Sequence, residues 1–129
     1  MLAINTKIDK TLLFLQFISF GVKSGKEFPK ADCYLDCRGV VDPSHTIGGT
    51  GDDPKVQTYI KTFSSIFPYF DTLRCHLDCL TSRRGAGHEY DKPFVVCCMC
   101  AHGIHRSRAM KHILADMFKG QGYTKVEVK

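Results

Sequence analysis

Apolar residues along the 129-residue chain gather in short runs, and four of these runs have the character of strands. Residues 11–25 are dense in aromatic and large apolar side chains and end in glycines, which predicts a core strand and its exit loop. Residues 31–39 predict a second strand. The continuous run FVVCCMC at 94–100 favours a central strand covered on both faces, and the alternating residues 123–129 predict a final edge strand.

Two further segments have the period of an amphipathic helix. Asp53 and Pro54 provide an N-cap and a first-turn residue for the earlier one. Its apolar positions follow at helical spacing: Val56, Tyr59, Ile60, Phe63, Ile66, Phe67 and Phe70. We expect Pro68 to end or kink this helix, with a shorter continuation beyond it. The second helix is predicted from Ser107 to a stop at Gly120, with apolar residues Met110, Ile113, Leu114, Met117 and Phe118.

The connections between these segments are polar. The stretch from Gly39 to Pro54 and residues 81–93 are rich in residues that favour turns, and both predict long surface loops. Strands that alternate with helices predict an α/β fold with a small mixed or parallel sheet flanked by helices. We expect a single domain over residues 1–129, with a phosphate-binding strand-loop-helix formed by residues 94–120.

Composition is that of an ordinary globular protein. Hydrophobic residues make up 43% and charged residues 24%, which argues against disorder and against a membrane span. The net charge of +5 favours anionic partners without identifying any. The apolar run after Lys7 and Lys10 faintly resembles a secretion signal, but Gln16 and Ser19 interrupt it, so a buried strand is the preferred interpretation.

The seven cysteines do not form a disulfide pattern. Their number is odd and three of them crowd the apolar segment 94–100, so reduced thiols in a cytoplasmic protein are the better interpretation. Cys75, His76 and Cys79 raise the alternative of structural zinc, but no C-x2-C pair recurs at finger spacing. We predict neither a metal site nor a cofactor.

The turn after residue 100 has the chemistry of an anion site. A loop between a buried strand and a helix offers unpaired N–H groups and the positive end of the helix dipole, so phosphate is the expected guest. Gly103 allows close approach of the backbone, and Arg106 can hold two oxygens at once. His102 and His105 add donors, although either could instead cap the following helix.

The spacing C-x-x-G-x-x-R-S from Cys100 to Ser107 is also that of cysteine-dependent phosphatases. The helix dipole and Arg106 would lower the pKa of the thiol, and Ser107 could hydrogen-bond the thiolate. Against this alternative, Met99 replaces the histidine that usually precedes the nucleophile, and a buried, unreactive thiol is a common state. Three aspartates have no obvious place as a general acid: Asp71, Asp78 and Asp91.

Four segments in this order resemble the C-terminal domain of the RapZ family: SFGVKSG, YLDCRGVVDP, GTGDDPKV and CCMCAHGIHRSRAMKHILADMF. The resemblance covers about residues 17–129. It implies an α/β domain that binds an aminosugar phosphate and small RNA. It therefore implies a sensor or adaptor in place of a hydrolase.

The resemblance also implies a set of ligand-binding residues. Arg38 should face the pocket, although it could instead pair with Asp36 or another acid, and His45 is the histidine of its loop, one place later than usual. Asp42 and Pro43 stand where the family usually has Asn and Pro. With Cys100 at the base, the remaining predicted ligand-binding residues are Ala101, His102, Gly103, Ile104, His105, Arg106 and Ser107.

The expected partner is thus a phosphorylated small molecule, either a sugar phosphate or a nucleotide. RNA is a second candidate partner, because Lys119, Lys125 and Lys129 make the C-terminal end basic, although Glu127 dilutes that charge. A membrane partner is not expected, and the sequence carries no signal for an oligomeric state.

Overall fold

The structure, a computed structural model, describes residues 9–84 and 92–129. Its centre is a four-stranded sheet in the order β2-β3-β1-β4. The strands are β1 (Phe14–Gly21), β2 (Cys33–Asp36), β3 (Phe94–Cys100) and β4 (Lys125–Val128), and every adjacent pair is parallel. The predicted α/β class is confirmed, with a parallel sheet. As predicted, β3 lies in the interior of the sheet and β4 at its edge.

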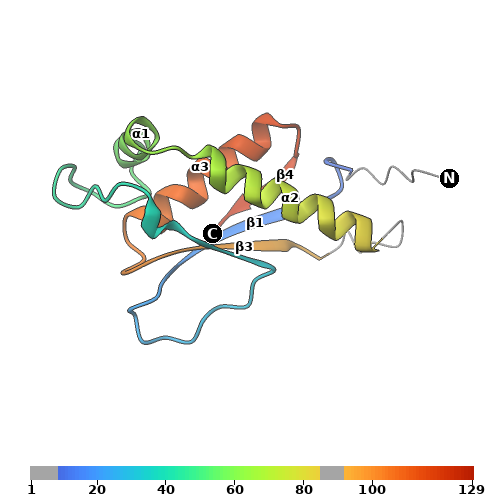
Figure 1. The fold of residues 1–129 in the computed structure, drawn as a ribbon, viewed down its shortest axis with the longest axis horizontal. Helices are drawn as coiled ribbons and strands as arrows, with labels where there is room; N and C mark the ends of the chain where they lie inside the picture. Colours follow the sequence, from blue (N-terminus) through green and yellow to red (C-terminus); the bar gives the residue numbers. More distant parts are fainter. Residues whose placement is uncertain (1–8, 85–91) are drawn as a thin grey trace.

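In the described part of the chain, three α-helices and one short 3-10 helix connect the strands (Figure 1). The 3-10 helix η1 (Cys37–Gly39) follows β2 directly. Between β2 and β3 the chain forms α1 (Pro54–Phe63) and α2 (Phe67–Arg84), and between β3 and β4 it forms α3 (Arg106–Gly120). Asp53 is the N-cap of α1, since its carboxylate accepts the N–H of Lys55, as the sequence predicted.

The helical region 54–84 is interrupted earlier than expected. The first helix ends at Ser64, whose backbone is extended and whose Oγ accepts the N–H of Val41 at 2.7 Å. Pro68 was expected to end or kink the helix, but it lies in the first turn of α2, where a missing N–H costs no helical hydrogen bond. The continuation is longer than the first helix, 18 residues against 10. It extends to Arg84 and takes in the first residues of the loop predicted at 81–93, and residues 85–91 of that loop lie outside the described residues.

The three helices cover one face of β3. The residues of its other face are also largely withdrawn from solvent, with Cys97 fully buried and Val95 and Met99 partly buried, which agrees with the expected central strand. The β2-to-β3 and β3-to-β4 crossovers both advance in the same direction across the sheet, and the right-handed rule therefore puts their helices on one face. The β1-to-β2 connection runs the other way and contains no helix among the described residues. In Figure 1 this connection lies on the opposite side of the strands from the three helices. Phe28 from this connection packs there, with its ring centroid 5.0 Å from that of Phe20 and 6.5 Å from that of Tyr34.

The hydrophobic core fills the space between the sheet and the helices. Leu15 and Phe17 of β1 lie beside Phe94 and Val96 of β3, and all four side chains are buried. Phe118 of α3 packs on this layer and on three aromatic rings: Phe17, Phe70 and Tyr123. Because the strands are parallel, their carboxyl ends lie at one edge of the sheet, where ligands usually bind in such folds.

Among the described residues, no helix is both long enough and apolar enough to cross a membrane.

Candidate anion-binding site

The turn between β3 and α3, residues 100–107, lies at the carboxyl edge of the sheet and is called here the 100–107 loop. The strand ends at Cys100 and the helix begins at Arg106, so only five residues connect them. Gly103 takes a φ of 73°, a conformation that side-chain-bearing residues rarely adopt. A loop of this kind places backbone N–H groups at the positive end of the α3 dipole.

Two neighbouring backbones hold the loop in place. On one side, the N–H groups of Val22 and Lys23 donate to the carbonyls of Cys100 and Ala101 at 2.9 and 2.8 Å. A Cβ added at Gly21 would lie 2.4 Å from the carbonyl carbon of His102, so this approach requires glycine.

On the other side, the 40–53 loop closes against the start of α3. Gly51 donates its N–H to the carbonyl of Ile104 at 2.8 Å. A Cβ at Gly51 would lie 2.3 Å from both the Ala109 nitrogen and the His105 carbonyl oxygen. Asp52 then holds His112 of α3 in a 2.9 Å contact. Long-range contacts on both sides therefore set the shape of the loop.

The Cys100 sulfur sits at the base of the loop and is almost fully buried, with 3% of the residue exposed. Its Sγ lies 3.1 Å from Ser107 Oγ and accepts the N–H of Gly103 at 3.3 Å. Burial alone would raise the pKa of the thiol. Hydrogen bonds to the hydroxyl and N–H of Ser107 and to the N–H of Gly103, together with the charge of Arg106, outweigh burial and lower the pKa below its ordinary value.

Arg106 is held by the backbone and not by an acid. Its Nη1 donates to the carbonyl oxygen of Arg38 at 2.9 Å, and it forms no salt bridge with any residue in 9–84 or 92–129. Arg38 itself is turned aside, because its guanidinium binds Asp36 through two bonds of 2.9 and 2.7 Å. Within the described residues, no acid therefore compensates the charge of Arg106 by direct contact.

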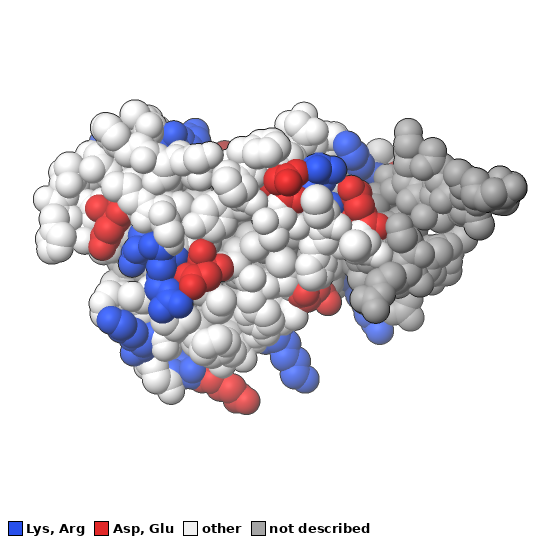
Figure 2. Space-filling view, in the orientation of Figure 1, with Lys and Arg blue, Asp and Glu red and all other residues white. Residues whose placement is uncertain are grey.

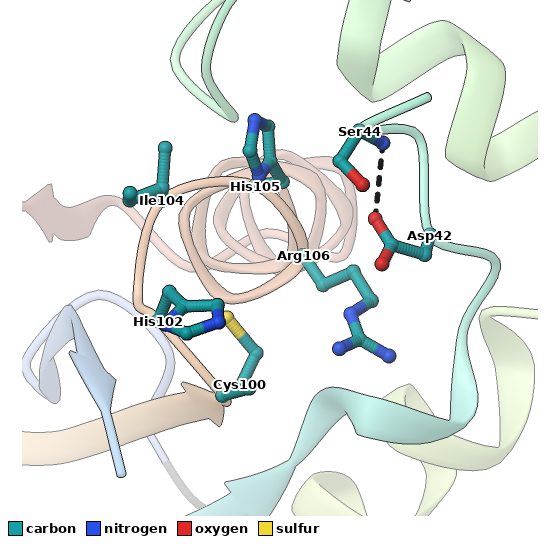
Figure 3. A pocket seen from close by; sticks show the side chains of 8 residues that line it. Asp42, Ser44, Cys100, His102, Ile104, His105 and Arg106 are labelled. Carbon is teal, nitrogen blue, oxygen red and sulfur yellow. Dashed lines mark hydrogen bonds between the residues drawn. The ribbon is translucent and has the colours of Figure 1, made fainter. Parts of the chain in front are cut away.

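The 100–107 loop and the 40–53 loop enclose a cavity of about 100 Å³. Its lining is Asp42, Ser44, Cys100, Ala101, His102, Ile104, His105 and Arg106. Figure 3 shows Arg106 between Cys100 and His102 on one side and Asp42 and Ser44 on the other. Over the same end of the molecule, Figure 2 shows acidic and basic side chains close together.

Asp42 brings a negative charge to this cavity. Its carboxylate accepts the N–H of Ser44 at 3.0 Å. The hydrogen bonds from the N–H and side chain of Ser44 lower the pKa of Asp42 most, and the charges of Arg106 and His105 lower it further. The cavity therefore combines an ionised carboxylate with the guanidinium of Arg106 and two imidazoles.

The family comparison confirms the resemblance to the RapZ C-terminal domain. The RapZ C-terminal domain family matches residues 13–129 of the chain. The chain belongs to this family. Membership indicates a nucleotide- or phosphate-related binding or adaptor role. No curated protein matches the chain.

The structure gathers most of the residues predicted to bind ligand in this RapZ C-terminal domain. Five of them line the cavity with Cys100, namely Ala101, His102, Ile104, His105 and Arg106. Gly103 and Ser107 do not line the cavity and instead bond the Cys100 sulfur from within the loop. His105 does not cap α3 with its side chain, which removes that alternative for its imidazole.

Two predicted residues lie differently. Arg38 contributes its carbonyl to Arg106 while its side chain stays on Asp36. His45 is not among the cavity-lining residues, whereas its neighbours Asp42 and Ser44 are. The sequence Asp-Pro-Ser at positions 42–44 could have predicted that Asp42 and Ser44 lie together. An aspartate side chain commonly accepts the backbone N–H two residues later and so closes a turn.

All seven cysteines are free thiols. Within residues 9–84 and 92–129, no group of three His, Cys, Asp or Glu side chains is arranged to hold a metal ion. Cys75 and Cys79 of the zinc alternative are exposed on α2.

Proposed function

We propose that this RapZ C-terminal domain binds the phosphoryl group of a small molecule, a sugar phosphate or a nucleotide, in the 100–107 loop. The observation that carries the proposal is a set of backbone N–H groups that form no hydrogen bond within the described residues. In the described part of the chain, no acceptor takes the N–H groups of Ala101, His102, Ile104 or His105. Backbone N–H groups in a loop that leads into a helix are a common way to bind phosphate.

The charge of the cavity supports an anionic guest. The N-terminal turn of α3 adds the positive end of the helix dipole, and Arg106 offers a guanidinium that forms no salt bridge with a carboxylate of the described residues. A phosphate with two negative charges would therefore meet both a fixed dipole and a planar fork of donors. Asp42 would face the part of the ligand outside the phosphoryl group.

The volume of the cavity limits what can enter it. About 100 Å³ is small beside the roughly 300–1,000 Å³ typical of sites for drug-sized ligands. The cavity thus suits a phosphoryl group and its nearest atoms. The sugar or base would lie at the mouth, between the 40–53 loop and the exposed side chain of Ile104.

Thermal unfolding tests this proposal with three probes: inorganic phosphate, glucose 6-phosphate and adenosine monophosphate. At about 100 times its dissociation constant, a bound probe adds about 2.7 kcal/mol to the free energy of unfolding. Arg106→Ala should abolish that increase. Arg108→Ala is the matched control, because Arg108 lies on the same helix, pairs with Asp52 and does not line the cavity.

An unchanged unfolding temperature with all three probes would overturn the proposal. So would an increase that persists in Arg106→Ala, since the ligand would then lie elsewhere. A larger increase with the sugar phosphate or the nucleotide than with inorganic phosphate would identify the group that extends beyond the cavity.

RNA binding remains a second, less supported function. Lys125 is exposed on the edge strand β4, while Lys129 pairs with Glu127 at 3.9 Å, which weakens the basic character of this end. If RNA binds here, affinity should fall steeply with salt, and Lys125→Ala should reduce the slope by about one. A salt-independent affinity would remove this function.

A further inference from the structure

The arrangement around Cys100 exceeds what phosphate binding needs. A binding loop requires N–H donors and a cation, yet here a sulfur that lines the cavity is also held by Ser107 and by the Gly103 N–H. These contacts favour the thiolate, the form of cysteine that attacks electrophiles. The sulfur and Arg106 lie on the same cavity, so a phosphoryl group bound by the arginine would lie within its reach.

We propose that the 100–107 loop hydrolyses phosphomonoesters, with Cys100 as the nucleophile. This inference rests on the proposed phosphate binding at the same loop. Arg106 and the loop N–H groups hold the three non-bridging oxygens, which gain charge in the transition state. The absence of a histidine before Cys100, where Met99 stands, is offset by the contacts of Ser107 and Gly103 to the sulfur.

The reaction has two displacement steps. In the first, the Cys100 thiolate attacks phosphorus, a P–S bond forms, and the P–O bond to the alcohol breaks. The leaving oxygen takes a proton from a side-chain acid. In the second, a water oxygen attacks phosphorus and gives its proton to the same group, while the P–S bond breaks. Inorganic phosphate leaves, and the thiolate is restored, so no oxidant or further reactant is needed.

His105 is the proton donor that the geometry favours. Its side chain lines the cavity and makes no capping bond to α3. The carboxylate of Asp42 lines the same cavity, and the charge of His105 is one of the smaller causes that lower the pKa of Asp42. His105 therefore has the role of a general acid in this scheme, with Asp42 on the same cavity.

The first experiment measures turnover of an aryl phosphate by the full chain. Wild type and Cys75→Ser should be active, because Cys75 is an exposed thiol on α2 far from this loop in sequence. Cys100→Ser should be inactive. Arg106→Lys should lose about 10²–10³-fold while the fold is retained, because lysine keeps the charge without the planar fork. Acid quenching should trap one phosphoryl group on the peptide that contains Cys100.

The second experiment separates general acid catalysis from a structural role of His105. An aryl oxide leaves without help, whereas an alkoxide needs a proton. His105→Asn should therefore slow hydrolysis of an alkyl phosphate by about 10²-fold or more and affect the aryl phosphate much less. An equal loss of hydrolysis rate on both substrates would mean that His105 is not the general acid.

The outcomes also distinguish this inference from the proposed function. Stabilisation by phosphate with no turnover and no phosphocysteine would overturn the hydrolysis and leave the binding function intact. Turnover that survives in Cys100→Ser would overturn the nucleophile assignment. Absence of both stabilisation and turnover would overturn both proposals.

Discussion

Cys98 and Cys100 lie two residues apart on the same face of β3, and both are buried. Nevertheless, the pKa values of their thiols are shifted in opposite directions. Contact with the thiol of Cys37, followed by burial, raises the pKa of Cys98 well above its ordinary value. The pKa of Cys100 is lowered, although burial alone would raise it. The difference arises because Cys98 faces other thiols and the core, whereas Cys100 faces a hydroxyl, backbone N–H groups and a guanidinium.

This contrast distinguishes the middle of the sheet from the carboxyl end of β3, which have different roles. The middle of the sheet supplies stability through close packing, and its thiols behave as small apolar residues. The carboxyl end of the strand is where the backbone leaves the sheet and where donors become available to a ligand or a sulfur. Proximity along the chain therefore says little about reactivity, and the atoms around each sulfur determine it.

The largest effect should follow from removing a large side chain in the middle of the sheet. Phe17 is fully buried and contacts Phe118. Phe17→Ala should lower the free energy of unfolding by about 3–5 kcal/mol. Arg106→Ala should change it by no more than about 0.5 kcal/mol without ligand. Urea unfolding measures both, and comparable losses in the two variants would break the division between core and site.

An intermediate effect should appear at high pH. Burial raises the pKa of the Cys97 thiol to about 11, against an ordinary value of 9. As the pH rises, the thiol loses its proton in the unfolded state before it does so in the folded state, which lowers the free energy of unfolding. The full stability is therefore present below pH 9 and is lost as the pH rises towards 11. We expect a loss of about 2 kcal/mol across this window, and Cys97→Ala should reduce it. A stability that is flat from pH 9 to 11 in the wild type would contradict this assignment.

A smaller effect should follow from removing the hydroxyl beside the site thiol. Ser107 is fully buried and contacts the Cys100 sulfur. Ser107→Ala should raise the pKa of Cys100, because burial then acts against fewer hydrogen bonds, and should cost about 1 kcal/mol of stability. The pH dependence of Cys100 alkylation, followed by mass spectrometry, measures the first change. An unaltered profile would mean that Ser107 does not stabilise the thiolate.

The main elements of the fold could be predicted from local patterns. The apolar run at 94–100 and the helical spacing from 107 to 120 gave β3 and α3 with nearly their observed bounds. The family resemblance and the α/β class were also confirmed. These features depend on period and on residues within one turn or one strand of each other, which a single sequence displays directly.

Other features depend on contacts between distant residues. The end of α1 is set by Ser64 bonding to Val41, a pair 23 residues apart, so the proline at 68 was a misleading signal. The placement of the three helices on one face of the sheet follows from the strand order and the right-handed crossovers, which the apolar run alone does not contain. Asp42 enters the cavity because the 40–53 loop closes on α3 through Gly51.

Protection of Cys100 from alkylation tests the central claim, phosphate binding in the 100–107 loop, most directly. The native protein is treated with iodoacetamide at neutral pH with and without inorganic phosphate, and labelling of each cysteine is followed by mass spectrometry. Phosphate should slow labelling of Cys100 in the wild type but not in Arg106→Ala, and should leave the exposed Cys75 unaffected. Labelling of Cys100 at the same rate with and without phosphate would contradict the claim.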